Sequence, residues 1–554
     1  MRRIAFVGAG PKALFALLEL HERYPASSAG DLRVEVFDPY PPGAGRVWQA
    51  GQPPELRLNV SARIVDASAA SLPGSESFAD WLARTEPRYS TEQYPPRAVV
   101  GRYLSAQFGL LAESAGFSLV HVPARVTDVV RTGDQWEVSS DAGSGYYDQV
   151  VLATGHGLPD EGSGTPRGPA CNKIPLIARY ASLGEEKLPE GSDVLIRGAA
   201  LTAYDAVLLL TEGRDGRWKE LEGAGGPWLE YVPSGREPAR ITMASRSTLP
   251  MDPKPGQVPA WIGTCLEEYR GEVRQWGRDL AARPSGPGAG YAGLWRILLA
   301  CAGECARMCG APTTPLGFWR TALTGRGTHG PDTGSSAEHI RRSIEVNRGN
   351  AVPGTEWLWA RVWSGLYPEM VQAVSRVYWK PAACREFGRV SKSLERLAFG
   401  PPERTALKLL ALFDNGLLQQ GPFPAMLPAD TILVDAVTPP SGVLAAPAPA
   451  GRPMSSLMAG LLSAGEVMVR EAERGLLTDP DGSCIDEGGN RNESLWALGR
   501  PTEGPTLGHD TLNRALHDEP RLWAQRIAAF CMPNTLEREH ESPDARQSTA
   551  HRTP

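Results

Sequence analysis

A glycine-rich turn near the N-terminus constrains the fold more than any other feature of the sequence. Residues 4–7 form a short β-type run that leads directly into residues 8–13 (GAGPKA), and leucines recur behind this turn at helical spacing. Residues 32–38 are typical of a second strand, and this strand ends in an acid. The order strand, glycine turn, helix, strand and acid predicts a βαβ unit of an α/β fold.

The turn matches the pattern G-x-G-x-x-A, in which each small residue has a physical role. Gly8 permits the tight turn, Gly10 lets the backbone approach a pyrophosphate, and Ala13 keeps the helix close to the strand. The phosphates would then meet a helix N-terminus, where unpaired N–H groups favour anions, and the acid would accept hydrogen bonds from ribose hydroxyls. An ordinary strand-to-helix turn is the alternative interpretation. The candidate dinucleotide-binding residues of this unit are Gly8, Gly10, Pro11, Lys12, Ala13 and Asp38.

A later segment indicates that the dinucleotide is FAD. Residues 118–155 are typical of an antiparallel β meander, and the last eight of them (DQVVLATG) have the form of the Ala-Thr-Gly segment of flavoproteins that bind two dinucleotides. In those proteins the meander rejoins the first sheet, and small residues let the backbone pass beside the FAD. Ala153, Thr154 and Gly155 are therefore candidate FAD-binding residues. A buried strand followed by a glycine turn is the alternative.

A second βαβ unit is expected to bind the nicotinamide cofactor. Residues 193–197 form another β-type run, followed by residues 198–200 (GAA) and a strongly apolar helix pattern. A nicotinamide-binding turn favours glycine at its second position, and Ala200 places an additional methyl group there. The next predicted strand ends at Arg246, where an arginine can accommodate the 2′-phosphate of NADPH; a solvated surface arginine is the alternative. The candidate NADPH-binding residues are Gly198, Ala200, Ser245 and Arg246.

The fold class that follows is α/β, with two Rossmann-like dinucleotide-binding domains, one for FAD and one for NADPH, and a helical insertion. We expect the first part of the FAD domain over residues 1–171, ending in a Gly/Pro-rich bridge, and the NADPH domain with the insertion over residues 172–385. Residues 386–532 should return to the FAD domain and close it with helices. Residues 533–554 are polar and charged, without aromatic residues, which is typical of a disordered tail.

Composition excludes several other classes of protein. The chain of 554 residues is too long for one core and has the balance of a soluble globular protein, with 42% hydrophobic and 22% charged residues. A net charge of -6 and the lack of Lys/Arg runs argue against a nucleic-acid partner. No apolar segment is long enough for a membrane span or a signal peptide, so we expect a cytoplasmic protein. The oligomeric state stays open.

The cysteines do not predict a disulfide framework or a dithiol mechanism. Eight cysteines in a chain of this length are few, and no CxxC pair stands beside the flavin turn. Cys301, Cys305 and Cys309 are spaced four apart and share one helix face. A metal site would need further ligands nearby, so we expect a core face and no metal.

Four segments resemble one known family, the FAD/NAD(P)-binding proteins related to class B flavin monooxygenases and amino-acid N-hydroxylases. They lie at residues 34–48 (VEVFDPYPPGAGRVW), 94–104 (YPPRAVVGRYL), 231–246 (YVPSGREPARITMASR) and 495–504 (LWALGRPTEG). The characterised relatives of this kind oxidise aspartate to nitrosuccinate. The resemblance therefore implies NADPH-dependent N-oxygenation of a small amine or amino acid by O2, through a C4a-hydroperoxyflavin, with L-aspartate as the first candidate.

The resemblance also implies which residues lie along the flavin. Residues 43–48 and Leu58 would follow it, Val126 would meet the adenine, and residues 501–504 would close over the pyrimidine end of the ring with a helix N-terminus. Asn59 is the candidate catalytic residue beside the isoalloxazine ring. The further cofactor-binding candidates are Arg46, Val47, Trp48, Leu58, Val126, Thr502 and Glu503. A dicarboxylate substrate would need arginines, and those available are Arg57, Arg63, Arg341 and Arg342.

Two other functions remain compatible with these residues. The first is an NADPH-dependent flavin oxidoreductase or Baeyer–Villiger-type oxygenase that acts on carbon. The second is a flavin-binding sensor without catalysis, for which a degenerate turn at Ala200 would be natural.

Overall fold

The structure is a computed structural model, and its described residues are 1–24, 30–156, 173–175, 180–223, 225–282, 290–327, 335–427, 430–509 and 511–531. The expected Gly/Pro-rich bridge at residues 157–169 and the expected tail at residues 533–554 lie outside these residues. Among the described helices, none has both the length and the apolar character that crossing a membrane requires.

The first sheet carries the N-terminal glycine turn at the carboxyl end of a central strand. Its six strands lie in the order β15-β16-β7-β1-β2-β3, and all neighbours are parallel except β15 and β16. Since β1 lies between β2 and β7, the turn after β1 is flanked by the ends of both. The strands are β1 (Arg2–Val7), β2 (Leu32–Phe37), β3 (Ser118–Val122), β7 (Gln149–Leu152), β15 (Ser483–Ile485) and β16 (Arg491–Ala497).

Side-chain alternation along β1 explains how both faces of this sheet are covered. Ile4 and Phe6 join the core formed with α1, α3 and α13, whereas Ala5 and Val7 join the core formed with the antiparallel meander β4–β5–β6 and α12. The antiparallel meander consists of β4, β5 and β6 alone. The expectation that it also includes residues 118–122 and 149–152 is wrong, because β3 and β7 pair in parallel with β2 and β1. The covering elements are α1 (Pro11–Arg23), α2 (Phe78–Thr85), α3 (Arg97–Ser114), β4 (Val126–Thr132), β5 (Gln135–Ser140), β6 (Gly143–Tyr147), α12 (Ser456–Ser463) and α13 (Glu519–Cys531).

The second sheet is wholly parallel and has the strand order β13-β12-β9-β14-β8. Two of its strands, β13 and β14, come after residue 385, where the sequence was expected to return to the FAD domain. The return to the first sheet therefore follows Asp435. The elements here are β8 (Lys173–Pro175), β9 (Asp193–Arg197), α4 (Leu201–Leu209), the hairpin β10 (Arg217–Leu221) and β11 (Trp228–Val232), β12 (Arg240–Ala244), α11 (Glu403–Asn415), β13 (Leu418–Gly421) and β14 (Thr431–Asp435).

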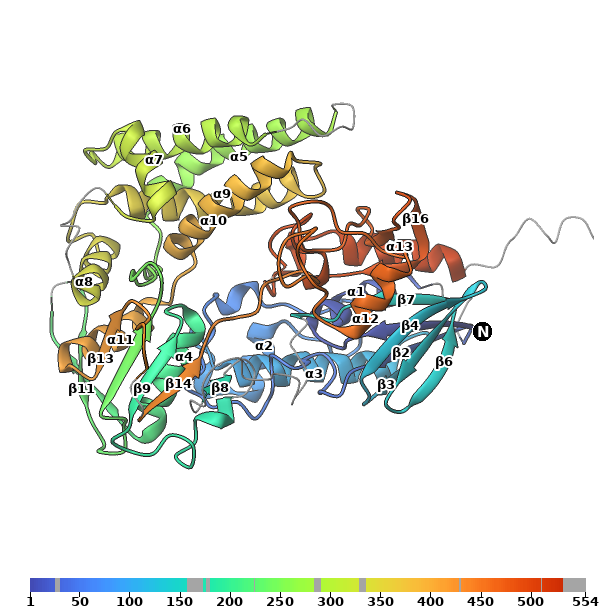
Figure 1. The fold of residues 1–554 in the computed structure, drawn as a ribbon, viewed down its shortest axis with the longest axis horizontal. Coiled ribbons are helices and arrows are strands. Elements are labelled where there is room, and N and C mark those ends of the chain that lie inside the picture. Colours follow the sequence, from blue (N-terminus) through green and yellow to red (C-terminus); the bar gives the residue numbers. More distant parts are fainter. Residues whose placement is uncertain are drawn as a thin grey trace, which may run out of the picture.

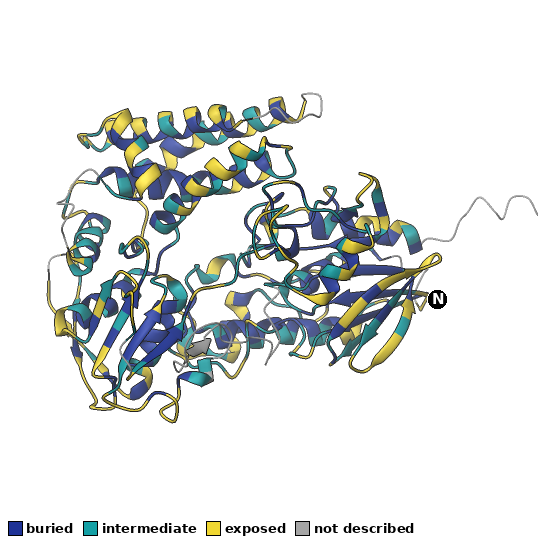
Figure 2. Ribbon diagram, viewed as in Figure 1, coloured by how far each residue is buried: buried dark blue, intermediate teal, exposed yellow. Residues whose placement is uncertain are grey.

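The helical insertion lies between β12 and α11, and its helices form a separate layer except α8, which packs against α11 (Figure 1). Helix α5 packs against α6 and α9, and α9 also packs against α10. The helices bury their inner faces and expose their outer faces, as Figure 2 shows, so the α/β fold with a helical insertion is confirmed. The helices are α5 (Ala260–Ala281), α6 (Ala292–Met308), α7 (Pro315–Thr324), α8 (Ser336–Asn347), α9 (Thr355–Val374) and α10 (Pro381–Ala398).

Candidate functional site

The turn after β1 has a backbone conformation that favours glycine at its first position. Gly8 has a φ of +106°, and its N–H donates to the carbonyl oxygen of Phe37 at 2.9 Å. A Cβ added at Gly8 would lie 2.3 Å from the carbonyl oxygen of Ala153. Gly8 therefore lets the end of β7 pass directly beside the turn, and Thr154 and Gly155 follow at this edge of the sheet.

Gly10 leaves open space in front of α1. Its φ of -74° suits any residue, but a Cβ added there would find no atom within 4 Å. Gly10 is the N-cap of α1, no side chain caps the first turn, and Pro11 occupies the first helical position. Ala13 is fully buried behind the turn, and Lys12 is half-buried. No side chain thus caps the start of α1, and binding of an anion there stays a prediction.

The carboxylate of Asp38, at the end of β2, stabilises the turn through hydrogen bonds. Its Oδ2 accepts a hydrogen bond from the N–H of Ala9 at 2.9 Å, and its Oδ1 accepts one from the N–H of Tyr40 at 2.9 Å. Burial raises the pKa of Asp38, and these backbone hydrogen bonds oppose the shift. The carboxylate therefore shapes the turn itself. Contact with a ribose stays a prediction, for which each oxygen retains further acceptor capacity.

The loop of residues 41–48 folds against the same turn. The N–H of Gly43 donates to the carbonyl oxygen of Ala9 at 2.7 Å, and a Cβ added at Gly45 would lie 3.0 Å from the Cα of Gly10. The flavin-facing candidates on this loop differ in exposure: Arg46 and Trp48 are half-buried, while Val47 is exposed. The loop thus lies beside the open space at Gly10.

Leu58 and Asn59 lie where the first part of the chain meets the segment that follows β12. The N–H of Leu58 donates to the carbonyl oxygen of Pro95 at 3.0 Å, and its side chain is buried. Asn59 is half-buried, and its carbonyl oxygen accepts a hydrogen bond from Nζ of Lys254. Lys254 was not anticipated from the sequence, because a lone lysine in a proline-rich loop carries no recognisable pattern.

The remaining flavin candidates lie at the return to the first sheet. Val126 is buried in β4, next to a bulge in its pairing with β5. The Thr502 hydroxyl donates to the carbonyl oxygen of Gly499 at 2.9 Å, and Glu503 forms an ion pair with Arg500 at 3.0 Å. A Cβ added at Gly499 would lie 2.8 Å from Cγ of Lys12, so this return passes close to the first turn of α1.

The expected helix N-terminus over the flavin is not present at residues 501–504. Residues Arg500–Thr502 form a single 3₁₀ turn, and the next α-helix, α13, begins at Glu519. Gly504 has a φ of +138° and precedes Pro505, so the chain turns away at this point.

The turn after β9 repeats the geometry of the turn after β1. Gly198 has a φ of +120°, and its N–H donates to the carbonyl oxygen of Ala244 at 2.8 Å. A Cβ added there would lie 3.3 Å from the carbonyl oxygen of Ala436, which follows β14 as Ala153 follows β7. The two sheets therefore present the same arrangement of turn, helix N-terminus and returning strand.

Ala200 is the N-cap of α4, as Gly10 is the N-cap of α1. Its φ of -123° is ordinary extended backbone, its side chain is exposed, and no side chain caps the helix. The methyl group thus fits the turn without strain and projects from the place where a pyrophosphate would approach.

Arg246 lies beyond the end of β12, next to this second turn. It is exposed, and no described residue pairs with its guanidinium. The N–H of Ser245 donates to the carbonyl oxygen of Gly421 at 3.1 Å, which fixes the start of the loop. In contrast, Arg197 at the end of β9 is held by Asp435, with Nε 2.8 Å from Oδ1. Of these two arginines, Arg246 is the one available to a ligand.

The four arginines considered for a dicarboxylate substrate lie in different surroundings. Arg57 pairs with Glu92, Arg63 is exposed, and Arg341 pairs with Asp414 at 2.8 Å on an exposed surface. Arg342 is half-buried, and its Nε has no hydrogen-bond partner. A fifth arginine, which the sequence analysis missed, is Arg361 in α9. Its signal was an arginine inside an otherwise apolar aromatic run, WLWARVW.

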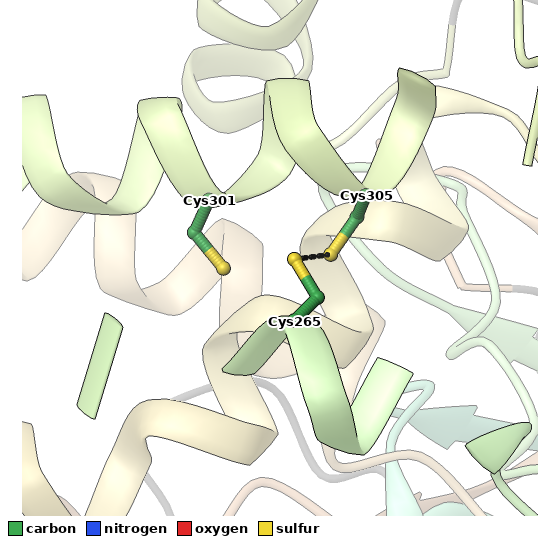
Figure 3. Close-up of side chains that lie close together, drawn as sticks. All are labelled: Cys265, Cys301 and Cys305. Carbon is green, nitrogen blue, oxygen red and sulfur yellow. Dashed lines mark hydrogen bonds between the residues drawn. The ribbon is translucent and has the colours of Figure 1, made fainter. Parts of the chain in front are cut away.

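Three cysteines of the helical insertion converge, but not the three that share a sequence spacing. Cys265 of α5 lies 3.2 Å from Cys305 of α6 between sulfur atoms, and Cys301 lies beside them (Figure 3). All three are buried in the helical core, whereas Cys309 is half-buried. Burial raises the pKa of Cys265 to about 12, whereas hydrogen bonds with Cys301 and Cys265 lower the pKa of Cys305. Cys301 and Cys305 thus form the expected core face.

Comparison with known proteins identifies the first domain. Residues 5–157 match the protein family described as FAD-NAD(P)-binding. This range contains the first glycine turn, Asp38 and the segment ending at Gly155. This part of the chain is therefore similar to FAD-NAD(P)-binding proteins, and the expected kind of cofactor is confirmed.

The similar characterised proteins are enzymes that oxygenate an amino-acid nitrogen. The chain is 32% identical over 289 residues to an L-aspartate N-monooxygenase (nitrosuccinate-forming) from Streptomyces cremeus, an alignment that covers 45% of this chain and 42% of that protein. It is 31% identical over 272 residues to nitrosuccinic acid synthase npaA from Aspergillus oryzae, with 45% and 40% covered. The matched part thus spans about two fifths of these relatives. Among solved structures, an ornithine hydroxylase from Pseudomonas aeruginosa aligns with a TM-score of 0.45 and 12% identity, covering 96% of this chain and 98% of that one.

Proposed function

We propose that the protein is an FAD- and NADPH-dependent monooxygenase that oxygenates the nitrogen of a small amine or amino acid, with L-aspartate as the first candidate. The observation that carries the proposal is the pair of glycine turns with one geometry, on two parallel sheets of one chain. Hydride transfer from a nicotinamide to a flavin needs two such dinucleotide sites. The relatives named above supply the class of reaction.

The residues divide between the two cofactors according to the sheet that carries them. The turn at Gly8 and Gly10, the loop of residues 41–48 and the segment at Ala153 would hold FAD, and Asn59 would lie beside its ring. FAD, when bound, supplies the redox and oxygen chemistry. The turn at Gly198 and the exposed guanidinium of Arg246 would hold NADPH through its phosphates.

We also propose domain limits that follow the sheets instead of the composition. The FAD domain would comprise the residues before 157 together with those after Asp435. The NADPH domain would comprise the second sheet with its helices, interrupted by the insertion between β12 and α11.

The proposal is tested with the purified FAD-loaded protein, NADPH and O2, and a panel of amino acids. We expect one amino acid to accelerate NADPH oxidation and to give an N-oxygenated product by mass spectrometry. NADPH oxidation that every amine leaves unchanged, with hydrogen peroxide as the sole product, would contradict N-oxygenation. A lack of NADPH oxidation altogether would support the second candidate, a flavin-binding protein without turnover. The observation that favours this candidate is the methyl group of Ala200 at the place where the NADPH pyrophosphate would approach.

A further inference from the structure

One buried guanidinium in the helical insertion has no counter-group in contact with it. Arg361 of α9 is 6% exposed, and its Nε has no hydrogen-bond partner. No N–H group of its guanidinium donates a hydrogen bond within the described chain, and its Cζ lies 5.5 Å from the centroid of the Trp357 ring. Burial lowers the pKa of Arg361 to about 10. Asp252 attracts Arg361 electrostatically but accepts no hydrogen bond from it, so the guanidinium keeps unused donors in a buried position and has capacity for a further acceptor.

A second guanidinium lines the same cavity. Arg342 of α8 faces the cavity together with Arg361, and its Nε is also buried without a partner. Arg341, the residue before it, is engaged by Asp414 on an exposed surface. The two neighbouring arginines of α8 therefore differ in availability, and only Arg342 faces the cavity.

Two acidic side chains complete the cavity. Asp252 is buried, its Oδ1 accepts a hydrogen bond from His339, and its charge attracts Arg396 and Arg361. Glu356 is free at Oε2, which is buried without a partner, and burial and the nearby Asp252 raise its pKa. The cavity thus offers two cationic donors and one unengaged carboxyl group. A simple inorganic anion would leave that carboxyl group without a partner, whereas an amino acid brings an ammonium group for it.

The cavity adjoins the segment that carries Asn59. Asp252 lies two residues before Lys254, which donates to the carbonyl oxygen of Asn59. On the other side, Tyr94 interacts electrostatically with Arg361 and immediately precedes Pro95, the partner of Leu58. The charged groups therefore lie next to the edge of the proposed flavin site.

We propose that this cavity binds an acidic amino acid, with Arg361 and Arg342 holding its carboxylates and Glu356 accepting a hydrogen bond from its amino group. The inference rests on the proposed function and gives it a substrate class and a place. The cavity has space for about one water molecule, so a ligand enters by displacing a flexible side chain. Arg342, which is half-buried at the cavity wall, is the side chain able to move.

The test is calorimetric binding of L-aspartate and L-glutamate to the FAD-loaded protein, with L-alanine and succinate for comparison. We expect the acidic amino acids to bind more tightly than either comparison compound. Arg361→Gln and Arg342→Gln should each weaken L-aspartate binding about tenfold or more, since each removes a charge-assisted contact. Arg361→Lys should restore part of the loss. Arg341→Gln is the control on the helix of Arg342, and this variant should bind L-aspartate as tightly as the unmodified protein does.

The outcomes separate this inference from the proposed function. Unchanged L-aspartate binding in both Arg361→Gln and Arg342→Gln, or no binding of acidic amino acids to the unmodified protein, would overturn the inference. FAD content and the melting temperature identify a variant that has merely misfolded. If Arg361→Gln misfolds, L-aspartate binding by Arg361→Lys tests the role of the cation instead. Binding of L-aspartate without any N-oxygenated product would contradict the proposed function and leave the cavity assignment standing.

Discussion

The guanidinium of Arg97 and the carboxylate of Asp205 form a bidentate ion pair between α3 and α4, with N–O distances of 2.7 and 3.1 Å. The pair joins the first sheet's helices to the second sheet. Nε of Arg97 donates to the carbonyl oxygen of Arg57 at 3.0 Å, and the Tyr180 hydroxyl donates to Asp205 at 3.1 Å. Every group of this buried pair is thus engaged, which is the condition under which such a pair is tolerated.

Asp205→Ala should therefore destabilise the protein by about 3–5 kcal/mol, because it leaves the guanidinium of Arg97 buried without its counter-charge. The free energy of unfolding from denaturant titration measures the effect. Asp193→Ala is the matched control, since its pair with Arg240 is exposed and should contribute little. Equal losses in the two variants would show that the Arg97–Asp205 pair has no special role.

The two glycines of the first turn should respond to substitution in opposite ways. Gly8→Ala places a Cβ against the Ala153 carbonyl oxygen in a backbone conformation with φ of +106°, so we expect a poorly folded protein. Gly10→Val fills open space, so it should fold but lose FAD. Circular dichroism and the flavin absorbance of the purified variants distinguish these results. A folded Gly10→Val protein with full FAD content would contradict the placement of the phosphates.

The two βαβ units could be predicted from the sequence, because each unit is formed by residues within a span of about forty positions. The membership of β14 could not be inferred in this way. Its residues pair with β9, more than two hundred positions earlier, and a short apolar run fits either sheet equally well. The second glycine turn was predicted from sequence, but the strand that returns beside Gly198 and ends before Ala436 was not.

The candidate site shows the same limit. Glycine positions and the acid at the end of β2 follow from sequence, since their roles are set by the turn itself. Whether a charged side chain is paired or free to bind a ligand depends on which residues distant in sequence the fold places beside it. Arg341 and Arg342 are adjacent in sequence, yet Asp414 reaches only the first and the cavity only the second.

Arg246→Ala should weaken NADPH binding and leave NADH use unchanged. If the exposed guanidinium forks onto the 2′-phosphate, its loss removes on the order of 1.5–3 kcal/mol, which is about tenfold or more in affinity. Steady-state kinetics with both coenzymes measure the difference. Arg240→Ala, which alters an exposed arginine at the opposite end of β12, serves as the control. Equal losses for NADPH and NADH would make Arg246 a structural residue.

Stability should fall as the solution becomes acidic, in part through His509. Burial holds the pKa of His509 well below its usual range, with His517 and Lys12 adding to the shift. Below about pH 6.5 the unfolded chain takes up a proton that folded His509 does not, so the free energy of unfolding decreases as the pH falls.

His509→Gln should therefore flatten the stability profile between about pH 7 and pH 5. Thr506→Val is the control, because it removes a hydroxyl that His509 contacts at 2.8 Å without removing a titrating group. That variant should shift stability equally at all pH values. A profile with the same slope in His509→Gln and in the unmodified protein would show that His509 does not contribute.

Asn59 is the side chain on which we predict the proposed oxygen transfer to depend most directly. Its backbone is fixed by the hydrogen bond from Lys254, and its amide can donate and accept hydrogen bonds at once. Beside the flavin it would hold NADP+ or the activated oxygen in place, so its loss should damage oxygen transfer more than flavin reduction. Asn59→Ala should still consume NADPH but release mostly hydrogen peroxide, with little oxidised amine.

The measurement is the ratio of peroxide to N-oxygenated product at matched NADPH consumption, with the rate of anaerobic flavin reduction recorded separately. Asn59→Asp is a useful companion, because it keeps the shape of the side chain but removes the amide donor. If donation from the amide is what matters, both variants should release peroxide. If Asn59→Ala gives the same ratio as the unmodified protein, the side chain of Asn59 does not protect oxygen transfer.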